Sequence, residues 1–463
     1  MALKFVFDNK RTFKLNHSFS HTPMLMDNVE CDNYRSDDSV SRWGLLRNQE
    51  FLAIWFVGSM TSTIRWLEVL ALGIFVFDLT GSPFQVAMML ILRKLPLVFV
   101  GPLTGVLAER ANRRSVMISC LLVMSLICLG FAVLSWNGHL SVSYLGLSAV
   151  LNGLFWTLEN PVRRPLIGEI VGTPQLGAAM SLDAVTFSGT RLLGPLLGGV
   201  FLEFSGLGGV FIAGGVLYFL AALVSLKIRA HSHIYIEKST SLKVLLGNAL
   251  HLLRSHRLLT GILAVTIIFN LWGIPFLSMI PVIGKEVLGL SPLPVGLLVS
   301  VEGAGALLGA LYIVANGKLQ HYRRLYTYGV LLYLVMVLGF SQMQWVFPSA
   351  VCLLLVGLGG GFFGAMQSAL ILMCVPPEMR SRMMGVLSLC IGTGALGFFH
   401  IGVLADWLGT QMAVATCALE GLLMLLIVRL IWPEVVGDQA LPQHEPSIFV
   451  GRNQGSCPGV GEG

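Results

Sequence analysis

Long apolar runs dominate this 463-residue chain and restrict the folds that are open to it. Twelve of them can be marked, each close to the roughly 20 residues that a helix needs to cross a bilayer. They lie near residues 51–77, 84–107, 115–135, 141–158, 177–202, 208–228, 258–282, 294–315, 325–343, 346–374, 383–405 and 411–432. Because the runs are apolar on all sides and do not alternate in polarity, they predict membrane-spanning helices and exclude the strands of a barrel.

Charged residues make up only 12% of the chain, about half the share of an average soluble domain. Eighteen of the 54 charges lie in the two ends, 1–47 and 433–463, which leaves 36 for the 385 residues between them. No water-soluble fold covers so much apolar sequence with so few charges. We therefore predict an integral membrane protein with the lipid bilayer as a partner, and this class excludes a nucleic-acid binder, a disulfide scaffold and a disordered chain.

The eight cysteines show no metal-binding or disulfide pattern, since neither a Cys-x-x-Cys pair nor a Cys/His cluster occurs. The sequence also lacks a phosphate-binding loop for ATP and the turn motif of serine hydrolases. We expect no metal, no cofactor and no enzymatic activity. An ion gradient is the expected source of energy for any transport.

Positive charge predicts the orientation of the spans, because cytoplasmic loops carry an excess of Lys and Arg. With the N-terminus in the cytoplasm, sixteen basic residues lie in cytoplasmic loops and Lys285 alone lies on the other side. Both termini are therefore expected to be cytoplasmic, with twelve spans between them.

The spans fall into two sets of six that show an internal repeat. Six residues of 101–112 recur 204 positions later in 305–316, and seven of 189–206 recur 203 positions later in 392–409. Parallel repeats of this kind build the two halves of a transporter, with the substrate site between them. The expected organisation is a cytoplasmic N-terminal tail over 1–48, a six-helix bundle over 49–228, a cytoplasmic central loop with an amphipathic helix over 229–256, a second six-helix bundle over 257–432 and a cytoplasmic C-terminal tail over 433–463.

Two motifs resemble those of the major facilitator superfamily. Residues 105–114 are similar to its cytoplasmic motif Gly-x-Leu-Ala-Asp-Arg-x-Gly-Arg-Arg, with Glu109 in place of the aspartate and Asn112 in place of the second glycine. The resemblance implies a gating role for Gly105, Glu109, Arg110, Arg113 and Arg114. Residues 194–199 resemble the Gly-Pro-x-x-Gly-Gly motif of exporters and antiporters, and this implies a helix bend at Gly194, Pro195, Gly198 and Gly199. Shorter stretches resemble the subgroup that includes the enterobactin exporter and macrolide-efflux-type transporters.

Ionisable side chains inside membrane spans are costly, so each is expected to face protein or a watery cavity. The residues predicted to line a proton-coupling or substrate cavity are Glu68, Arg65, Arg93, Asp183, Arg191, Asn270 and Glu302. Glu68 and Glu302 suit proton coupling best, because spans one and eight line the cavity in the fold that the chain resembles. The alternative is that each charge belongs to a structural ion pair.

The spacing of these charges gives further expectations. Arg65 and Glu68 are three residues apart, hence able to pair on one helix face. Arg93 and Arg191 are expected either to pair with the acids or to hold an anionic substrate. His400 is expected to be a packing residue without a partner.

The predicted fold is therefore all-α, with two pseudo-symmetric six-helix bundles of the major facilitator type. The predicted function is export of a small amphipathic molecule, such as a drug, a macrolide-like natural product or a siderophore, by alternating access in exchange for protons. The expected location is the bacterial inner membrane, and the expected state is a monomer. The alternatives are an uptake carrier or lysophospholipid flippase of the same fold, or a membrane scaffold that transports nothing.

Overall fold

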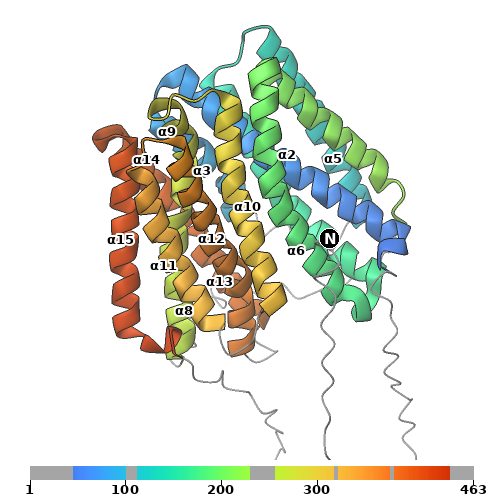
Figure 1. The fold of residues 1–463 in the computed structure, drawn as a ribbon. Coiled ribbons are helices and arrows are strands. Elements are labelled where there is room, and N and C mark those ends of the chain that lie inside the picture. Colours follow the sequence, from blue (N-terminus) through green and yellow to red (C-terminus); the bar gives the residue numbers. More distant parts are fainter. Residues whose placement is uncertain (1–44, 101–111, 230–255, 317–321, 376–379, 438–463) are drawn as a thin grey trace, which may run out of the picture.

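The computed structural model describes residues 45–100, 112–229, 256–316, 322–375 and 380–437, and this part of the chain is helical without strands (Figure 1). The longer helices are α2 (Gln49–Thr80), α3 (Pro83–Phe99), α5 (Arg113–Trp136), α6 (Val142–Ser225), α8 (Arg257–Ile268), α10 (Pro292–Asn316), α11 (Tyr322–Ser341), α12 (Val346–Cys374), α13 (Arg380–Gly392), α14 (Gly394–Leu408) and α15 (Thr410–Ile431). The short ones are η1 (Leu45–Arg47), the π-helix η2 (Phe269–Gly273), η3 (Ile274–Ser278), α9 (Ile280–Glu286) and η6 (Pro433–Val435).

Nine helical stretches of the described residues are long and apolar enough to cross a membrane. Helix α6 is longer than one span, because 84 residues would form a straight rod of about 126 Å, four times the thickness of the hydrocarbon core. Its backbone leaves helical angles at Gly172 and Gly206. These two glycines divide α6 into three segments, which contain the predicted runs at 141–158, 177–202 and 208–228.

The positions of two glycines agree with the internal repeat. Gly206 has a φ of 63° and Gly409, which lies 203 positions later, has a φ of 83°. Glycine adopts such angles without the steric cost that a side chain adds. Gly206 separates the last two segments of α6, and Gly409 separates α14 from α15. The same turn chemistry therefore occurs at the corresponding point of both repeats.

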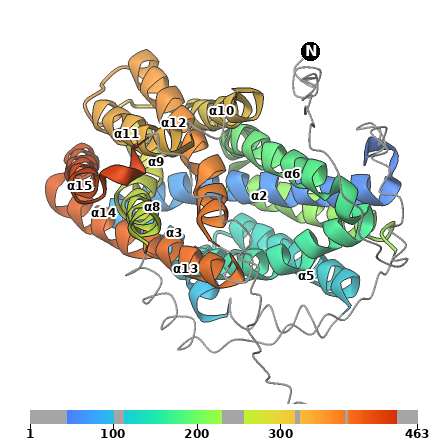
Figure 2. The same cartoon turned by 90° about the horizontal axis from the view of Figure 1, so that it is seen from below.

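Most helices of residues 45–229, here called the first half, lie on the opposite side of the molecule from those of 256–437, the second half, whereas α3 lies against α14 of the second half (Figures 1 and 2). Glycines bring the two halves together. A Cβ atom on Gly296 of α10 would lie 2.6 Å from the backbone oxygen of Pro195 in α6, and one on Gly402 of α14 would lie 3.0 Å from the Phe84 ring in α3. Close backbone contact through small residues is typical of helix packing in membranes.

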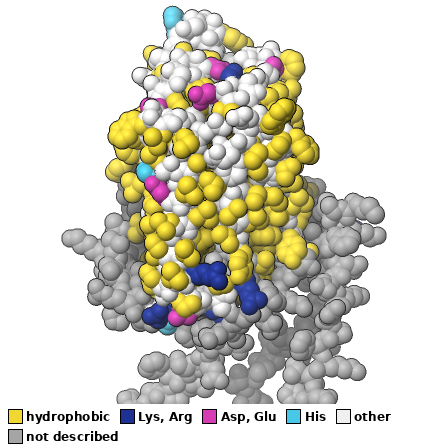
Figure 3. All heavy atoms as spheres, turned by 60° about the vertical axis from the view of Figure 1, so that its left-hand side comes forward, with side chains coloured by type: hydrophobic (Ala, Val, Ile, Leu, Met, Phe, Trp, Pro, Cys, Tyr) yellow, Lys and Arg dark blue, Asp and Glu magenta, His cyan; other side chains and the backbone are white. Residues whose placement is uncertain are grey.

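The surface of the described residues fits a lipid environment. Hydrophobic side chains cover the middle of the face in Figure 3, while Lys and Arg gather toward one end. Large apolar side chains such as Phe347 and Trp407 are about 80% exposed. We call the end where α2 begins and α15 finishes the tail end, and the opposite end, where α2 finishes, the far end.

Candidate functional site

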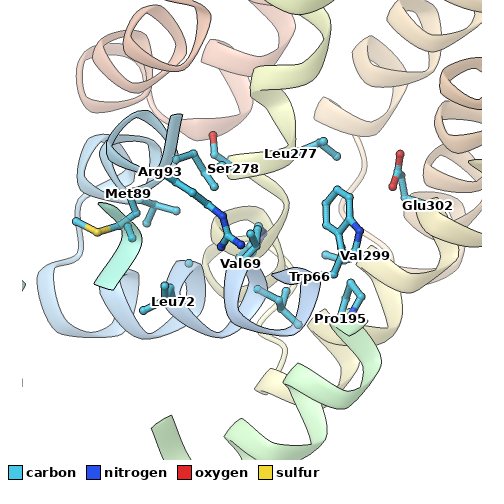
Figure 4. Close-up of a pocket in the computed structure, with 16 residues that line it drawn as sticks. Trp66, Val69, Leu72, Met89, Arg93, Pro195, Leu277, Ser278, Val299 and Glu302 are labelled. Atoms are coloured by element: carbon cyan, nitrogen blue, oxygen red, sulfur yellow. The ribbon is translucent and has the colours of Figure 1, made fainter. Parts of the chain in front are cut away.

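A mostly apolar pocket lies between the two halves (Figure 4). Helices α2, α3 and α6 contribute one wall, and η3, α9 and α10 contribute the other. Its charged lining residues are Arg93 and Glu302, and the Trp66 ring lies near Val299 and Pro195 in Figure 4. Apolar walls with a few polar groups are typical of small-molecule sites, and the cavity encloses about 40 Å³, which is less than a drug-sized molecule fills.

Glu302 forms an ion pair that crosses between the halves. Its Oε1 atom accepts a hydrogen bond of 2.5 Å from Nη2 of Arg191 in α6, and the Glu302 side chain is fully buried. The Arg191 guanidinium also lies 5.2 Å from the centre of the Trp66 ring. A Cβ atom on Gly303 would collide with the backbone of Arg191, so this glycine permits the approach of α10 to α6. The prediction that Arg191 pairs with one of the acids is confirmed.

Glu68 is equally buried, but its partners belong to the first half. The side-chain amide of Asn152 in α6 donates a hydrogen bond to Glu68 Oε2, and the thiol of Cys128 in α5 lies 3.6 Å from Oε1. Arg93 Nη2 donates to the amide oxygen of the same asparagine at 2.8 Å. Asn152 therefore joins the carboxylate to the guanidinium.

The expected pair between Arg65 and Glu68 is not formed among the described contacts. The guanidinium carbon of Arg65 lies instead 3.9 Å from the centre of the Trp156 ring and 5.3 Å from that of Phe187. A guanidinium is attracted to the face of an aromatic ring, and Asn152 already satisfies Glu68. The prediction was therefore wrong because it considered only one helix.

Asp183 is not among the residues that line the central pocket. Its carboxylate accepts hydrogen bonds of 2.6 and 3.3 Å from Arg163, which is 5% exposed and also binds Glu159 at 3.0 Å. All three residues belong to α6, in its first two segments. Arg163 lies beyond the predicted run at 141–158, because the first segment of α6 continues as a helix past that run. The guanidinium finds room against Gly58, where a side chain would collide with it. Asp183 thus belongs to a structural cluster within the first half.

Asn270 and Lys94 lie where α3 meets the second half. Asn270 is 1% exposed in the π-helix η2 and donates to the Thr266 carbonyl at 2.9 Å, while its own amide oxygen has no hydrogen-bond partner among the described residues. The Lys94 ammonium lies 5.2 Å from the centre of the Phe398 ring in α14. Single-turn π-helices often occur at functional sites. Asn270 therefore remains a candidate, and Lys94 joins it.

His400 does have a partner, contrary to the prediction. Its Nε2 atom lies 2.8 Å from Oε2 of Glu420, which also accepts a hydrogen bond of 2.8 Å from the Trp272 indole. Ligand atoms of His400, Cys417 and Glu420 lie within 4.8 Å of one another, so these three side chains could hold a metal ion, and no sequence motif indicated this group. A signal existed, since His400 and Glu420 lie nine and eleven residues from the Gly409 turn and therefore face each other across the hairpin.

The predicted gating motif falls largely outside the described residues. Gly105, Glu109 and Arg110 are not described. Arg113 forms an ion pair with Glu169 of α6, and Arg114 donates a hydrogen bond of 2.9 Å to the backbone oxygen of Leu226. Both arginines thus bind partners of the first half at the tail end. The gating role of the motif stays a prediction.

The predicted helix-bend motif at 194–199 lies within α6, whose backbone keeps helical angles there. Its glycines form close helix contacts. Gly194 and Gly198 face α2, where Cβ atoms would lie 2.5 Å from Trp66 and 2.7 Å from the backbone oxygen of Leu67, and Gly199 faces α10. The motif therefore holds α6 against a helix of each half, and bending at Pro195 stays a prediction.

Polar contacts between the halves concentrate at the far end. Lys285 of α9 binds Asp78 of α2 at 3.0 Å, and Asp406 of α14 accepts from the backbone nitrogen of Phe84 at 3.2 Å. Glu203 accepts from the backbone nitrogen of Leu293 at 3.2 Å. The polar contacts that the structure describes at the tail end, such as Arg113–Glu169 and Arg257–Glu434, each stay within one half. Asp78, Glu203 and Asp406 each come directly after the end of a predicted run, at 77, 202 and 405.

These features define a class of protein. Helices that can cross a membrane form two halves related by an internal repeat, and a pocket with buried charges lies between them. This is the architecture of a membrane transporter.

Comparisons with known proteins identify the family. A family model described as "Transmembrane secretion effector" matches residues 40–448. The chain therefore belongs to this family of major facilitator superfamily transporters, which confirms the superfamily recognised from the motifs.

Similar proteins include transporters from several bacteria. An uncharacterised transporter of Bacillus subtilis, YfiS, is 24% identical over 83% of this chain and 93% of its own length. A multidrug resistance efflux pump PmrA homologue of Lactococcus lactis is 24% identical over 72% of this chain and 80% of its own. Macrolide efflux protein A of Streptococcus pyogenes is 19% identical over 78% of this chain and 91% of its own.

Solved structures share the fold. A bacterial homologue of the human lysosomal transporter Spinster, in an inward-facing and occupied conformation, superimposes with a TM-score of 0.65, 14% identity and coverage of 86% of this chain and 99% of that one. The nucleoside transporter NupG gives a TM-score of 0.61 at 12% identity, over 82% of this chain and 98% of that one.

Proposed function

We propose that this protein is a proton-coupled exporter of small amphipathic molecules that works by alternating access. In the proposed arrangement, twelve spans form two six-helix bundles over 49–228 and 257–432, both tails are cytoplasmic, and the protein lies in a bacterial plasma membrane as a monomer. Its relatives named as a macrolide efflux protein and as a multidrug efflux pump homologue support export of a drug-like substrate.

The observation that carries the proposal is the Arg191–Glu302 pair between the halves. Glu302 Oε2 is buried without a hydrogen-bond partner among the described residues, so it is free to take up a proton. Protonation removes the negative charge and with it the attraction to Arg191. A proton on Glu302 would thus weaken a contact between α6 and α10, which lie in different halves.

The far-end contacts favour one state of the cycle. Asp78, Glu203 and Asp406 join the halves at that end, whereas the described polar contacts at the tail end stay within one half. With cytoplasmic tails, this state is closed toward the outside. Substrate would enter the pocket from the cytoplasm and leave after the far-end contacts break.

Gradient-driven transport tests the proposal. A pH gradient is imposed on inside-out vesicles, and uptake of a fluorescent amphipathic dye is measured for the wild type, Glu68→Gln and Glu302→Gln. Glu434→Gln, which removes a carboxylate at the tail end, is the matched control. We expect Glu302→Gln to lose gradient-driven uptake by about tenfold or more, which corresponds to roughly 1.4 kcal/mol or more. Glu434→Gln should retain it.

Other outcomes separate the rival functions. Intact gradient-driven uptake in both Glu68→Gln and Glu302→Gln would show that proton coupling is assigned to the wrong residues. Accumulation in right-side-out vesicles would favour an uptake carrier, and movement of labelled lysophospholipid would favour a flippase. No transport of any compound, together with a partner that is captured through the tails, would favour a scaffold.

A further inference from the structure

Four cations lie on the helices that line the pocket, with Arg93 in its lining, and two of the four are matched by carboxylates. Arg191 pairs with Glu302, and Arg93 is joined to Glu68 through Asn152. No described carboxylate lies within ion-pair distance of the other two, Arg65 and Lys94, whose recorded neighbours are aromatic rings. The pocket region thus has more positive than negative charge.

The two unmatched cations lie next to pocket-lining residues in sequence. Arg65 precedes Trp66 in α2, Lys94 follows Arg93 in α3, and both Trp66 and Arg93 line the pocket. Charged side chains inside a membrane protein normally pair with each other or mark the path of a substrate or ion. The arrangement therefore lacks a negative charge that a bound molecule can supply.

Aromatic rings surround the same cations. Arg65 lies over Trp156 and near Phe187, Lys94 lies over Phe398, and Trp66, the residue after Arg65, lines the pocket. Flat rings and apolar walls suit a flat apolar body, and the two cations suit an acidic group attached to it.

We propose that the transported molecule is an amphipathic organic anion whose negative charge is held by Arg65 and Lys94. This rests on the proposed function, since it names the substrate class of the same site. The carboxylates keep a separate role, because each is already matched by its own arginine. Outward movement of an anion removes negative charge from the inside, and inward movement of a proton adds positive charge to it. Transport is therefore driven by an inside-negative membrane potential as well as by the pH gradient.

A matched pair of probes tests the substrate class. 8-Anilino-1-naphthalenesulfonate and N-phenyl-1-naphthylamine share one ring system, and only the first carries an anionic group. Binding of each is measured to the full chain in nanodiscs of phosphatidylcholine, for the wild type, Arg65→Gln and Lys94→Gln. Arg429→Gln is the matched control, because it removes an exposed cation in the last turn of α15.

The sulfonate should bind the wild type more tightly than the naphthylamine does. Arg65→Gln and Lys94→Gln should each weaken sulfonate binding by about tenfold or more, the effect of losing one charged hydrogen bond, and leave naphthylamine binding within about twofold. Lys94→Arg, which keeps the positive charge, should bind the sulfonate as the wild type does. A loss seen in Lys94→Gln and not in Lys94→Arg is then due to the missing charge. Equal binding of the two probes to the wild type, or an equal loss in Arg429→Gln, would overturn the proposal.

Two further measurements distinguish a small-molecule anion from a lipid headgroup, and the anion proposal from the exporter proposal. Phosphatidylglycerol in the nanodiscs should leave sulfonate binding unchanged if the substrate is a small molecule, and should displace the probe if it is a lipid headgroup. Transport of neutral and cationic dyes without transport of the sulfonate would overturn the anion proposal and leave the exporter proposal standing. Sulfonate binding without transport of any compound would instead contradict the exporter proposal.

Discussion

The two buried carboxylates, Glu68 and Glu302, have very different surroundings. Glu68 contacts Cys128 and Asn152, and both belong to its own half. Glu302 contacts Arg191 of the other half. A change of charge on Glu68 therefore alters the packing within one half, whereas a change on Glu302 alters the contact between the halves. Burial alone therefore does not indicate a coupling residue, because the partner of the carboxylate decides which contact protonation changes.

The largest effect is expected for Arg191→Gln. This change leaves the Glu302 carboxylate buried without its partner, and such losses cost about 3–5 kcal/mol of stability. The double variant Arg191→Gln/Glu302→Gln should recover most of that loss, because no buried charge remains unpaired. Unfolding by detergent titration measures both. Full loss in the double variant would show that Arg191 stabilises the protein through packing on Trp66 and not through charge.

A smaller effect is expected for Asn152→Ala in the first half. Both Glu68 and Arg93 lose a hydrogen bond, and an unsatisfied buried polar group costs about 1–3 kcal/mol. The same titration measures the loss. Because these partners lie within one half, the equilibrium between open and closed states should stay unchanged. A shift of that equilibrium would break the distinction between the two carboxylates.

The smallest effect is expected at the far end, for Asp78→Asn. Its partner Lys285 belongs to the other half, but the pair is partly exposed, so it contributes about 0.2–1 kcal/mol. Losing it should shift the population modestly toward the state that is open at the far end. Cross-linking between cysteines at that end measures the shift, with Glu434→Gln at the tail end as the control. An unchanged yield would show that this pair does not hold the far end closed.

Much of the fold followed from the apolar runs, because a span has a minimum length and few charges. The ends of individual helices were predicted less well. The first segment of α6 continues beyond the predicted run at 141–158, and the added residues carry Arg163 to a buried position against Gly58. Asn112, expected to replace a glycine in a turn, instead caps α5 with a φ of −63°, as its side chain accepts from two backbone nitrogens.

The site was predictable to the extent that charges inside spans are rare. Glu68, Glu302, Arg93 and Arg191 were found in this way, and the Arg191–Glu302 pair was among the expected arrangements. Asn152 was not found, because uncharged polar residues are common in spans and carry no comparable signal. The far-end contacts of Asp78 and Asp406 depend on how two distant parts of the chain pack, and no local pattern records that.

The separation of the two halves at the tail end, measured against pH, shows directly whether protonation of Glu302 changes the contact between the halves. Spin labels at Ser115→Cys in α5 and Leu430→Cys in α15, in a chain without its native cysteines, report this separation. Protonation of Glu302 removes its attraction to Arg191 and so weakens the state that is closed at the far end. When the far end opens, the tail ends of the two halves approach each other. Lowering the pH should therefore shorten the tail-end distance in the wild type and in Glu68→Gln. In Glu302→Gln the short distance should dominate at every pH. A Glu302→Gln variant whose distances change with pH as the wild type's do would contradict the account.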